Sequence, residues 1–313
     1  MGDRIHDDEV DTSEATVRAL LCDQLPAWAD APVTRLGGTG TTNALWRVHG
    51  DPTDIVVRLP RMAGGAGGID TEVALLPHLA STPLADMIRV PRLIHSGSPS
   101  TAYPLRWMAA QWLAGDDLWS LRNSTDVASP ELPIHVAEVV RVLATLDDMP
   151  AADRAPGSRG GPLRPLLDRL HRWLDDPQWA AADLVDVATI TTLADEAAEL
   201  VDEPTPRRFV HGDLIPGNLL LHAGRLDAVI DWGGAGYGDP AQDLAPAWAL
   251  FDDAQRRRFR AALEVDDASW TRGRVIELEH AVGGVLYYVP RAHPLGDVMA
   301  RTLDRILADS KRV

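Results

Sequence analysis

Residues 209–221 read FVHGDLIPGNLLL and decide how the rest of the chain is interpreted. The segment begins and ends with apolar runs typical of buried strands, yet its middle holds His211, Asp213 and Asn218. A polar turn between strands is one explanation. A catalytic loop is the other, because a carboxylate there can accept a hydroxyl proton and an amide oxygen five residues later can bind a metal ion.

The segment that follows, LDAVIDWGGAGYGDPAQDLA (226–245), favours the catalytic loop. Residues 219–221 and 226–230 predict a hairpin, which places Asp231 at the end of a buried strand. Asp231 is either a cap for a turn or a second metal ligand that the hairpin returns to the side of Asn218. The spacing H-x-D-L-x-x-x-N, followed by such an aspartate, is that of protein kinases, where an Asp and an Asn bind Mg²⁺.

A glycine loop, LGGTGTTN (36–43), comes before both segments. It leads into the strand-like ALWRV (44–48) rather than into a helix, so it does not fit a dinucleotide-binding loop. A glycine loop between two strands suits a flap over phosphates, since its backbone N–H groups can approach them.

The chain of 313 residues is long enough for two lobes. Residues 1–110 predict a small strand-rich lobe, and residues 111–313 predict a larger, mostly helical one. Patterns in the first lobe indicate a helix over 12–25, a hairpin of strands 44–48 and 54–59, and a helix over 69–80 that Pro77 kinks or shortens. The second lobe shows helical patterns at 163–174, 190–201 and through much of 253–310, and a Pro/Gly-rich loop at 149–162 that we expect to be mobile.

The charge and composition exclude several classes of function. The formal charge of −16 argues against a nucleic-acid partner, and it is compatible with a cationic small molecule or simply with solubility. The single cysteine, Cys22, excludes an internal disulfide. The N-terminus lacks a signal-peptide pattern and no segment is apolar enough to span a membrane, which predicts a cytoplasmic protein without a membrane partner.

Together these segments resemble the aminoglycoside phosphotransferase family of kinase-like enzymes. HGDLIPGNLL matches the family pattern H-G-D-x-x-x-x-N-[LIV], and IDWGGAGYGDPAQDLA matches [IV]-D-[FW]-x(5)-G-[DE]-P-x-x-D-[LI]-A. The likeness runs from about residue 15 to near the C-terminus. It implies an α+β, bilobal, protein-kinase-like fold with a small antiparallel-sheet N-lobe that binds nucleotide and a helical C-lobe that holds the catalytic loop and the acceptor site.

The resemblance also implies roles for individual residues. Asp213 resembles the catalytic base, Asn218 and Asp231 the Mg²⁺ ligands, and Asp243 the buried aspartate that holds the catalytic loop. His211 is expected to anchor that loop, and Asp239 either helps to hold it or faces the acceptor. The residues expected to bind ATP or GTP are Gly38, Thr39, Gly40, Asn43, Arg58, Glu72, Gln111 and Leu113.

Two of these nucleotide-binding assignments have alternatives. Arg58 stands where many kinases carry a lysine that contacts the α- and β-phosphates and pairs with a helix glutamate, here Glu72. The guanidinium of arginine is planar and donates like a fork, whereas the ammonium of lysine is a compact point charge. The alternative interpretation of Arg58 is a residue on the exposed face of a strand. Backbone groups around Gln111–Leu113 are expected to bind adenine, although Trp112 can equally be part of the core.

The implied activity is transfer of a γ-phosphoryl group to a hydroxyl of a small molecule, first of all an aminoglycoside-type antibiotic, as in antibiotic resistance. Other acceptors of the same fold stay open: a macrolide, a cyclic peptide antibiotic, or a choline-like or sugar metabolite. An inactive nucleotide-binding regulator is the alternative from another class. Glu277, Glu279 and Asp297 either line an acceptor pocket or belong to solvated helix faces, and we expect the latter. The sequence does not indicate an oligomeric state.

Overall fold

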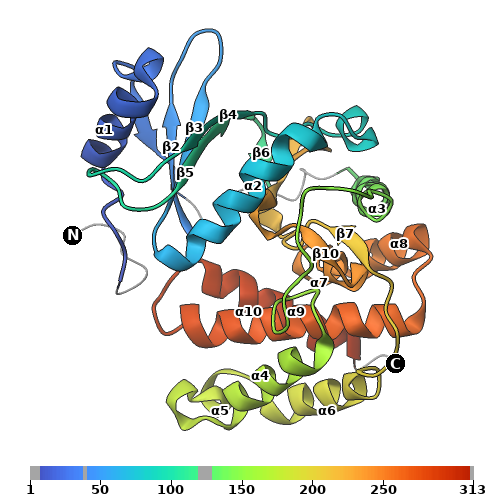
Figure 1. Ribbon diagram of the computed structural model, residues 1–313. Helices are drawn as coiled ribbons and strands as arrows, with labels where there is room; N and C mark the ends of the chain where they lie inside the picture. Colours follow the sequence, from blue (N-terminus) through green and yellow to red (C-terminus); the bar gives the residue numbers. More distant parts are fainter. Residues whose placement is uncertain (1–7, 38–40, 119–128, 311–313) are drawn as a thin grey trace. The chain divides into compact units, whose positions relative to one another are not determined.

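The computed structural model describes residues 8–37, 41–118 and 129–310 (Figure 1). The chain divides into two compact units. The first comprises Met1–Ala114 and Ile230–Gly234, and the second comprises Gly115–Val229 and Ala235–Val313. The five residues of the first unit that lie beyond residue 229 include Asp231, and no feature of the sequence indicated their return.

An antiparallel sheet of five strands forms the centre of the first unit (Figure 1). In spatial order its strands are β1 (Val33–Arg35), β2 (Asn43–Val48), β3 (Ile55–Pro60), β5 (Trp107–Gln111) and β4 (Leu93–Gly97). β2 and β3 pair in register from Asn43↔Pro60 to Val48↔Ile55, which confirms the predicted hairpin. The isolated cysteine of the chain, Cys22, is exposed on the first helix.

One face of this sheet is covered by α1 (Glu14–Gln24). Ser13 caps the helix by accepting a hydrogen bond from the Thr16 N–H. The apolar side of α1 packs on alternate residues of β2 and β3, because successive side chains of a strand point to opposite faces. The buried residues of this contact include Val17, Leu20, Leu21, Trp46, Val48, Ile55, Val57 and Leu59.

The side chains that alternate with this core, Arg58 among them, point to the opposite face, which meets α2 (Ala66–Leu79). Pro77 lies inside this helix, which ends two residues later at Leu79. The helix also packs on the turn η6 (Trp232–Gly234). This contact brings the segment around Asp231 to the first unit.

The second unit is mostly helical and contains two small sheets. Its strands are β6 (Asp116–Asp117), β8 (Leu219–His222) and β9 (Arg225–Val229) in one sheet, and β7 (Arg208–Val210) and β10 (Gly236–Gly238) in the other. Its helices are α3 (Leu132–Leu143), α4 (Leu163–Asp175), α5 (Ala181–Leu184), α6 (Val187–Ala198), α7 (Pro246–Ala249), α8 (Asp253–Leu263), α9 (Asp267–Tyr288) and α10 (Leu295–Ser310). β8 and β9 form the predicted hairpin. No helix within the described ranges is both long and apolar enough to cross a bilayer.

Helix α9 is the central helix of this unit and packs against α10, α4 and the turn η7 (Pro240–Leu244). Gly273 makes the contact with η7 possible. A Cβ at this position would lie 2.9 Å from the Ala241 carbonyl oxygen and 2.8 Å from a Leu244 methyl carbon. The close approach fixes η7, and η7 carries Asp243. The antiparallel sheet of the first unit and the helical second unit confirm the expected α+β class.

Candidate active site

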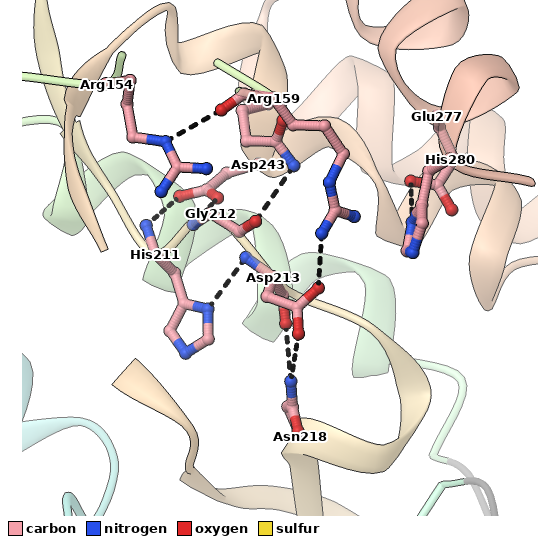
Figure 2. Close-up of polar contacts among 10 residues, drawn as sticks. Arg154, Arg159, His211, Gly212, Asp213, Asn218, Asp243, Glu277 and His280 are labelled. Carbon is pink, nitrogen blue, oxygen red and sulfur yellow. Dashed lines mark hydrogen bonds and ion pairs between the residues drawn. The ribbon is translucent and has the colours of Figure 1, made fainter. Parts of the chain in front are cut away.

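The loop after β7 is held in place by the buried carboxylate of Asp243. Asp243 is 1% exposed and accepts hydrogen bonds from the backbone N–H groups of His211 (2.7 Å) and Gly212 (2.9 Å) (Figure 2). Burial raises the pKa of Asp243, an effect that the nearby His211 and the two N–H groups oppose. These two hydrogen bonds tie the backbone of the loop that carries Asp213 to η7.

Asp213 and Asn218 meet in this loop (Figure 2). The Asn218 Nδ2 group donates to the Asp213 carbonyl oxygen at 2.8 Å and to its Oδ2 at 3.1 Å. The Asp213 N–H donates to Nδ1 of His211, which is fully buried. These bonds orient the Asp213 carboxylate and use the amide nitrogen of Asn218, so the amide oxygen is the atom that Asn218 can offer to a ligand.

A second side chain reaches Asp213 from residues 149–162, a segment whose sequence predicts only a loop. Nη2 of Arg159 lies 3.5 Å from Asp213 Oδ1, and each side chain is about a quarter exposed (Figure 2). Arg154 supports the same loop, because its Nε donates to the Arg159 carbonyl oxygen at 2.8 Å. The Pro/Gly composition of residues 149–162 indicated a loop and contained no signal of these contacts.

Asp239 makes its contacts within the protein. Its Oδ1 accepts from the Ala241 N–H at 3.0 Å and thereby caps η7, and its Oδ2 accepts from Nε of Arg272 on α9 at 2.8 Å. Both Asp239 and Arg272 are buried. Of the two roles that the sequence left open for Asp239, these contacts favour support of the site over contact with an acceptor.

The first unit brings three of the expected residues together. Arg58 Nη1 lies 3.0 Å from Glu72 Oε1, and Arg58 Nη2 lies 2.6 Å from Asp231 Oδ1. The Arg58 and Glu72 side chains are 9% and 1% exposed, whereas that of Asp231 is 40% exposed. Arg58 is therefore a buried residue of an ion-pair network, and the alternative of a surface strand residue is wrong.

The electrostatics of this cluster are set by burial. Burial alone would lower the pKa of Arg58, but the carboxylates of Asp231 and Glu72 outweigh it and raise the pKa. Glu72 responds in the opposite sense: burial raises its pKa to about 7, although Arg58 opposes the shift. Its Oε2 atom finds no hydrogen-bond partner within the described segments. Arg58 is thus fully charged, and Glu72 is the group of the cluster that can exchange a proton near neutral pH.

Two glycines allow Asp231 to reach Arg58. A Cβ on Gly233 would lie 3.0 Å from the Gly68 carbonyl oxygen, so α2 and η6 approach backbone to backbone. The Trp232 N–H donates to Glu72 Oε1 at 3.4 Å, and the Trp232 side chain is fully buried. Asp231 itself has a φ of +66°, a left-handed conformation that aspartate tolerates better than most residues.

The other expected nucleotide-binding residues lie in the same unit or outside the described ranges. Gly38, Thr39 and Gly40 lie outside the described residues. Asn43 begins β2 opposite Pro60. Gln111 ends β5, and its N–H donates to the Arg92 carbonyl oxygen at 2.8 Å, so a contact of its backbone with a base would use the carbonyl. Leu113 follows two residues later and is buried.

Glu277 and Glu279 of α9 are not solvated, contrary to expectation. Glu277 is 1% exposed and Glu279 is 3% exposed, because α9 is surrounded by other helices. Arg169 pairs with Glu279 at 2.6 Å. Glu277 Oε2 lies 3.4 Å from Nδ1 of His280 (Figure 2), and its Oε1 has no hydrogen-bond partner in the described parts of the chain. Asp297, by contrast, is exposed as expected.

The first unit thus carries the buried Arg58–Glu72 pair, and the second carries a loop in which Asp213 and Asn218 are paired. The model of the APH family, described as the phosphotransferase enzyme family, matches residues 33–278. The chain belongs to this family. The resemblance noted in the sequence is therefore confirmed, and so is the expectation that the protein is a phosphotransferase.

Individual relatives are distant from this phosphotransferase in sequence. Hygromycin-B 4-O-kinase from Escherichia coli is 26% identical over 230 residues, which cover 59% of this chain and 67% of the relative. The structure of APH(2″)-IIIa in complex with GDP and kanamycin superimposes with a TM-score of 0.73 at 19% identity, covering 96% of this chain and 99% of the other. Macrolide 2′-phosphotransferase MphH from Brachybacterium faecium gives a TM-score of 0.63 at 21% identity over 91% and 98% of the two chains. The expected kinase-like fold is confirmed by these likenesses.

Proposed function

We propose that this phosphotransferase moves the γ-phosphoryl group of ATP or GTP to a hydroxyl of a small molecule, with Asp213 as the general base. The observation that carries the proposal is the geometry around Asp213. Its carboxylate is a quarter exposed and is oriented by Asn218, in a loop that Asp243 holds through two backbone hydrogen bonds. A side chain with this exposure can reach an acceptor hydroxyl and still keep a fixed direction.

In the proposed reaction, the Asp213 carboxylate accepts the proton of the acceptor hydroxyl as the oxygen attacks phosphorus. General-base catalysis of this kind contributes about 10²–10⁴-fold in rate. Arg58 would contact the nucleotide phosphates, and Glu72 would fix its direction, since the two are joined at 3.0 Å. A guanidinium is suited to this role because it presents several N–H donors to phosphate oxygens.

The residues assigned to Mg²⁺ are Asn218 and Asp231, each described in its own unit. In the described segments no group of three or more His, Cys, Asp or Glu side chains is placed to hold a metal ion. An amide oxygen and a carboxylate suit Mg²⁺ nonetheless, because this ion prefers oxygen ligands and takes several of them from water and phosphate. Bound Mg²⁺ would supply positive charge to the phosphate oxygens and align them for transfer.

A cationic acceptor, first of all an aminoglycoside, is supported by two observations and one comparison. The chain carries a net charge of −16, and Glu277 is a buried carboxylate whose Oε1 lacks a hydrogen-bond partner in the described parts. An ammonium group of a ligand would be the partner for such an oxygen once the side chains that cover Glu277 moved to admit it. The relative from E. coli is named for a kinase of hygromycin B, which fits the same class of acceptor.

A macrolide is the second candidate, since a macrolide 2′-phosphotransferase shares the fold. The two candidates differ in the charge that the acceptor site must accommodate. Substitution of Glu277 therefore separates them: Glu277→Gln should weaken the binding of an acceptor with several ammonium groups more than that of a macrolide.

The test is incubation of the purified protein with Mg-ATP or Mg-GTP and a panel that contains hygromycin B, kanamycin, a macrolide, a cyclic peptide antibiotic, choline and sugars. Mass spectrometry detects the gain of one phosphoryl group. Asp213→Asn serves as the control, because it preserves the size of the side chain and one acceptor oxygen but removes the base. Product from wild type and none from Asp213→Asn supports the proposal.

Two outcomes contradict it. Equal turnover by Asp213→Asn would remove Asp213 from the role of base. Binding of nucleotide by the wild type without any consumption of it, in the presence of Mg²⁺ and the whole panel, would favour the inactive regulator.

A further inference from the structure

The backbone of the segment from Ala152 to Gly160 is hydrogen-bonded to Tyr237 and Asp239 of the same unit. Tyr237 of β10 donates its N–H to the Ala152 carbonyl oxygen at 3.0 Å and accepts from the Arg154 N–H at 2.7 Å. The Asp239 N–H donates to the Gly160 carbonyl oxygen at 2.9 Å. The expected mobile loop is thus held at both ends by hydrogen bonds to the strand β10 and to the start of η7.

Arg159 lies between these backbone hydrogen bonds, and the conformation of the loop directs its side chain toward Asp213. Gly160 has a φ of +75°, a conformation that favours glycine, and Arg154 holds the Arg159 carbonyl oxygen at 2.8 Å. The Arg159 guanidinium then lies 3.5 Å from Asp213 Oδ1 (Figure 2). This single long contact involves one of five N–H donors, so the guanidinium can donate to a further group while it stays beside Asp213.

A protein cation at this place would add to the effect of Mg²⁺ in the reaction proposed above. In the transition state the acceptor oxygen is bonded to phosphorus while Asp213 takes its proton, so the anionic phosphoryl group lies within a few ångströms of the carboxylate. The catalytic loop from His211 to Asn218 contains neither lysine nor arginine that could offset this repulsion. In the described parts of the chain, Arg159 is the cation whose side chain contacts the Asp213 carboxylate, and Arg154 acts on Asp213 from farther away.

We propose that Arg159 is a catalytic residue that donates hydrogen bonds to the phosphoryl group during its transfer. The inference rests on the proposed function of Asp213. In the step, the acceptor oxygen forms a bond to γ-phosphorus, its proton passes to Asp213, and the bond from γ-phosphorus to the bridging oxygen breaks with its electron pair leaving on the nucleoside diphosphate. Arg159 remains protonated throughout and stabilises the charge on the equatorial phosphoryl oxygens.

A purely structural ion pair is the competing explanation, and it predicts different behaviour. A structural role would appear as lower thermal stability and would depend on the side chain being attached to the loop. A catalytic role would appear in kcat, would spare the KM of the acceptor, and would be restored in part by any cation of similar shape. Stability and kcat therefore have to be measured on the same variants.

The experiment compares Arg159→Gln, Arg159→Lys and Arg159→Ala with the wild type and with Asp213→Asn. Turnover is followed as phosphate transfer or release from Mg-ATP and Mg-GTP, with and without hygromycin B and kanamycin, and thermal unfolding is recorded for each variant. The matched control is Arg164→Gln, because Arg164 follows the loop, is 60% exposed and pairs only loosely with Asp202 at 3.6 Å. Arg159→Ala is also assayed with guanidinium ion at concentrations that leave the wild type unaffected.

We expect kcat of Arg159→Gln to fall about 10²–10³-fold, the usual effect of removing one donor to a developing anion. The acceptor KM and the unfolding temperature should change little, Arg159→Lys should recover part of the loss, and guanidinium should partly rescue Arg159→Ala. Arg164→Gln should behave as the wild type.

Two results would overturn the inference alone. One is wild-type kcat in Arg159→Gln while Asp213→Asn is inactive. The other is a loss of kcat that follows the loss of stability and that neither lysine nor guanidinium restores. Turnover retained by Asp213→Asn, or no turnover by the wild type with either nucleotide and every acceptor of the panel, contradicts the proposed function itself, and the inference falls with it.

Discussion

Arg58 and Asp231 form an ion pair of 2.6 Å although 173 residues separate them in the chain. The same guanidinium contacts Glu72 at 3.0 Å, so one arginine joins a strand, a helix and the turn that follows β9. The residue assigned to the nucleotide phosphates and one of the residues assigned to Mg²⁺ are thus partners of each other in this structure. A bound nucleotide would compete with Asp231 for Arg58.

Substitution of Arg58 should therefore affect both stability and nucleotide use. Arg58→Gln leaves the buried Glu72 without its cation, and we expect a loss of about 3 kcal/mol in the free energy of unfolding. Arg58→Lys should be less destabilised and should raise the KM of the nucleotide, because an ammonium cannot bridge both carboxylates as a fork does. Urea unfolding and steady-state kinetics measure the two effects. The control is Arg106→Gln, whose partner Asp70 is exposed, and an equal loss of stability there would contradict the argument.

The pH dependence of the unfolding free energy should reveal the titration of Glu72. Its pKa in the folded protein is raised from 4.5 to about 7, so the folded state binds this proton more tightly than the unfolded state does. The corresponding stability is fully present below pH 4.5 and is lost as the pH rises through about 7. In Glu72→Gln this titration is absent. The difference in unfolding free energy, wild type minus variant, should therefore fall across this window and level off above it; a difference that is constant or rises with pH would contradict the assignment.

Asp243 should matter for stability and for turnover together. Asp243→Ala leaves two backbone N–H groups buried without acceptors, and an unsatisfied buried group costs about 1–3 kcal/mol. The loop that carries Asp213 would lose its support, so kcat should fall as well. Chemical unfolding and the phosphate assay test this, with Asp202→Asn as a control because Asp202 is 93% exposed. An active and fully stable Asp243→Ala protein would show that the loop is held by other contacts.

Gly273 should tolerate no side chain. A Cβ there would lie 2.9 Å from the Ala241 carbonyl oxygen, which belongs to the backbone of η7 and cannot rotate away. We expect Gly273→Ala to lose about 1–3 kcal/mol of stability, as overpacked sites do. The matched control is Gly67→Ala in α2, where a Cβ meets nothing within 4 Å and should stabilise the helix by roughly 0.5–1 kcal/mol. Thermal unfolding of the two variants should shift in opposite directions.

Much of the site could be predicted because its residues follow local rules. Asp213 and Asn218 lie five apart in one loop, and Asp231 follows a hairpin, so their spacing reflects geometry that the chain makes locally. The helix and hairpin patterns of the first unit reflect the periodicity of buried faces. The strand pairing confirms both hairpins, and the roles of Asp213, Asn218 and Asp231 stay predictions.

The parts that escaped prediction depend on contacts between distant segments. Arg159 lies in a Pro/Gly-rich loop whose composition indicates a turn and nothing about what the loop binds. The sequence predicts that Glu277 and Glu279 are solvated, because a charged residue on a helix is usually exposed. They are buried because α9 is surrounded on several sides, a fact of packing that no window of sequence contains.

The return of residues 230–234 to the first unit has a consequence for protein engineering. A gene fragment that ends at Ala114 would encode the whole five-stranded sheet but would lack Asp231, Trp232 and Gly233, and so would leave Arg58 with one carboxylate and α2 with an uncovered backbone. Exchange of the two units between homologues by a single crossover would create mismatched pairs at the same place. A chimaera therefore needs residues 230–234 to come from the same homologue as the sheet.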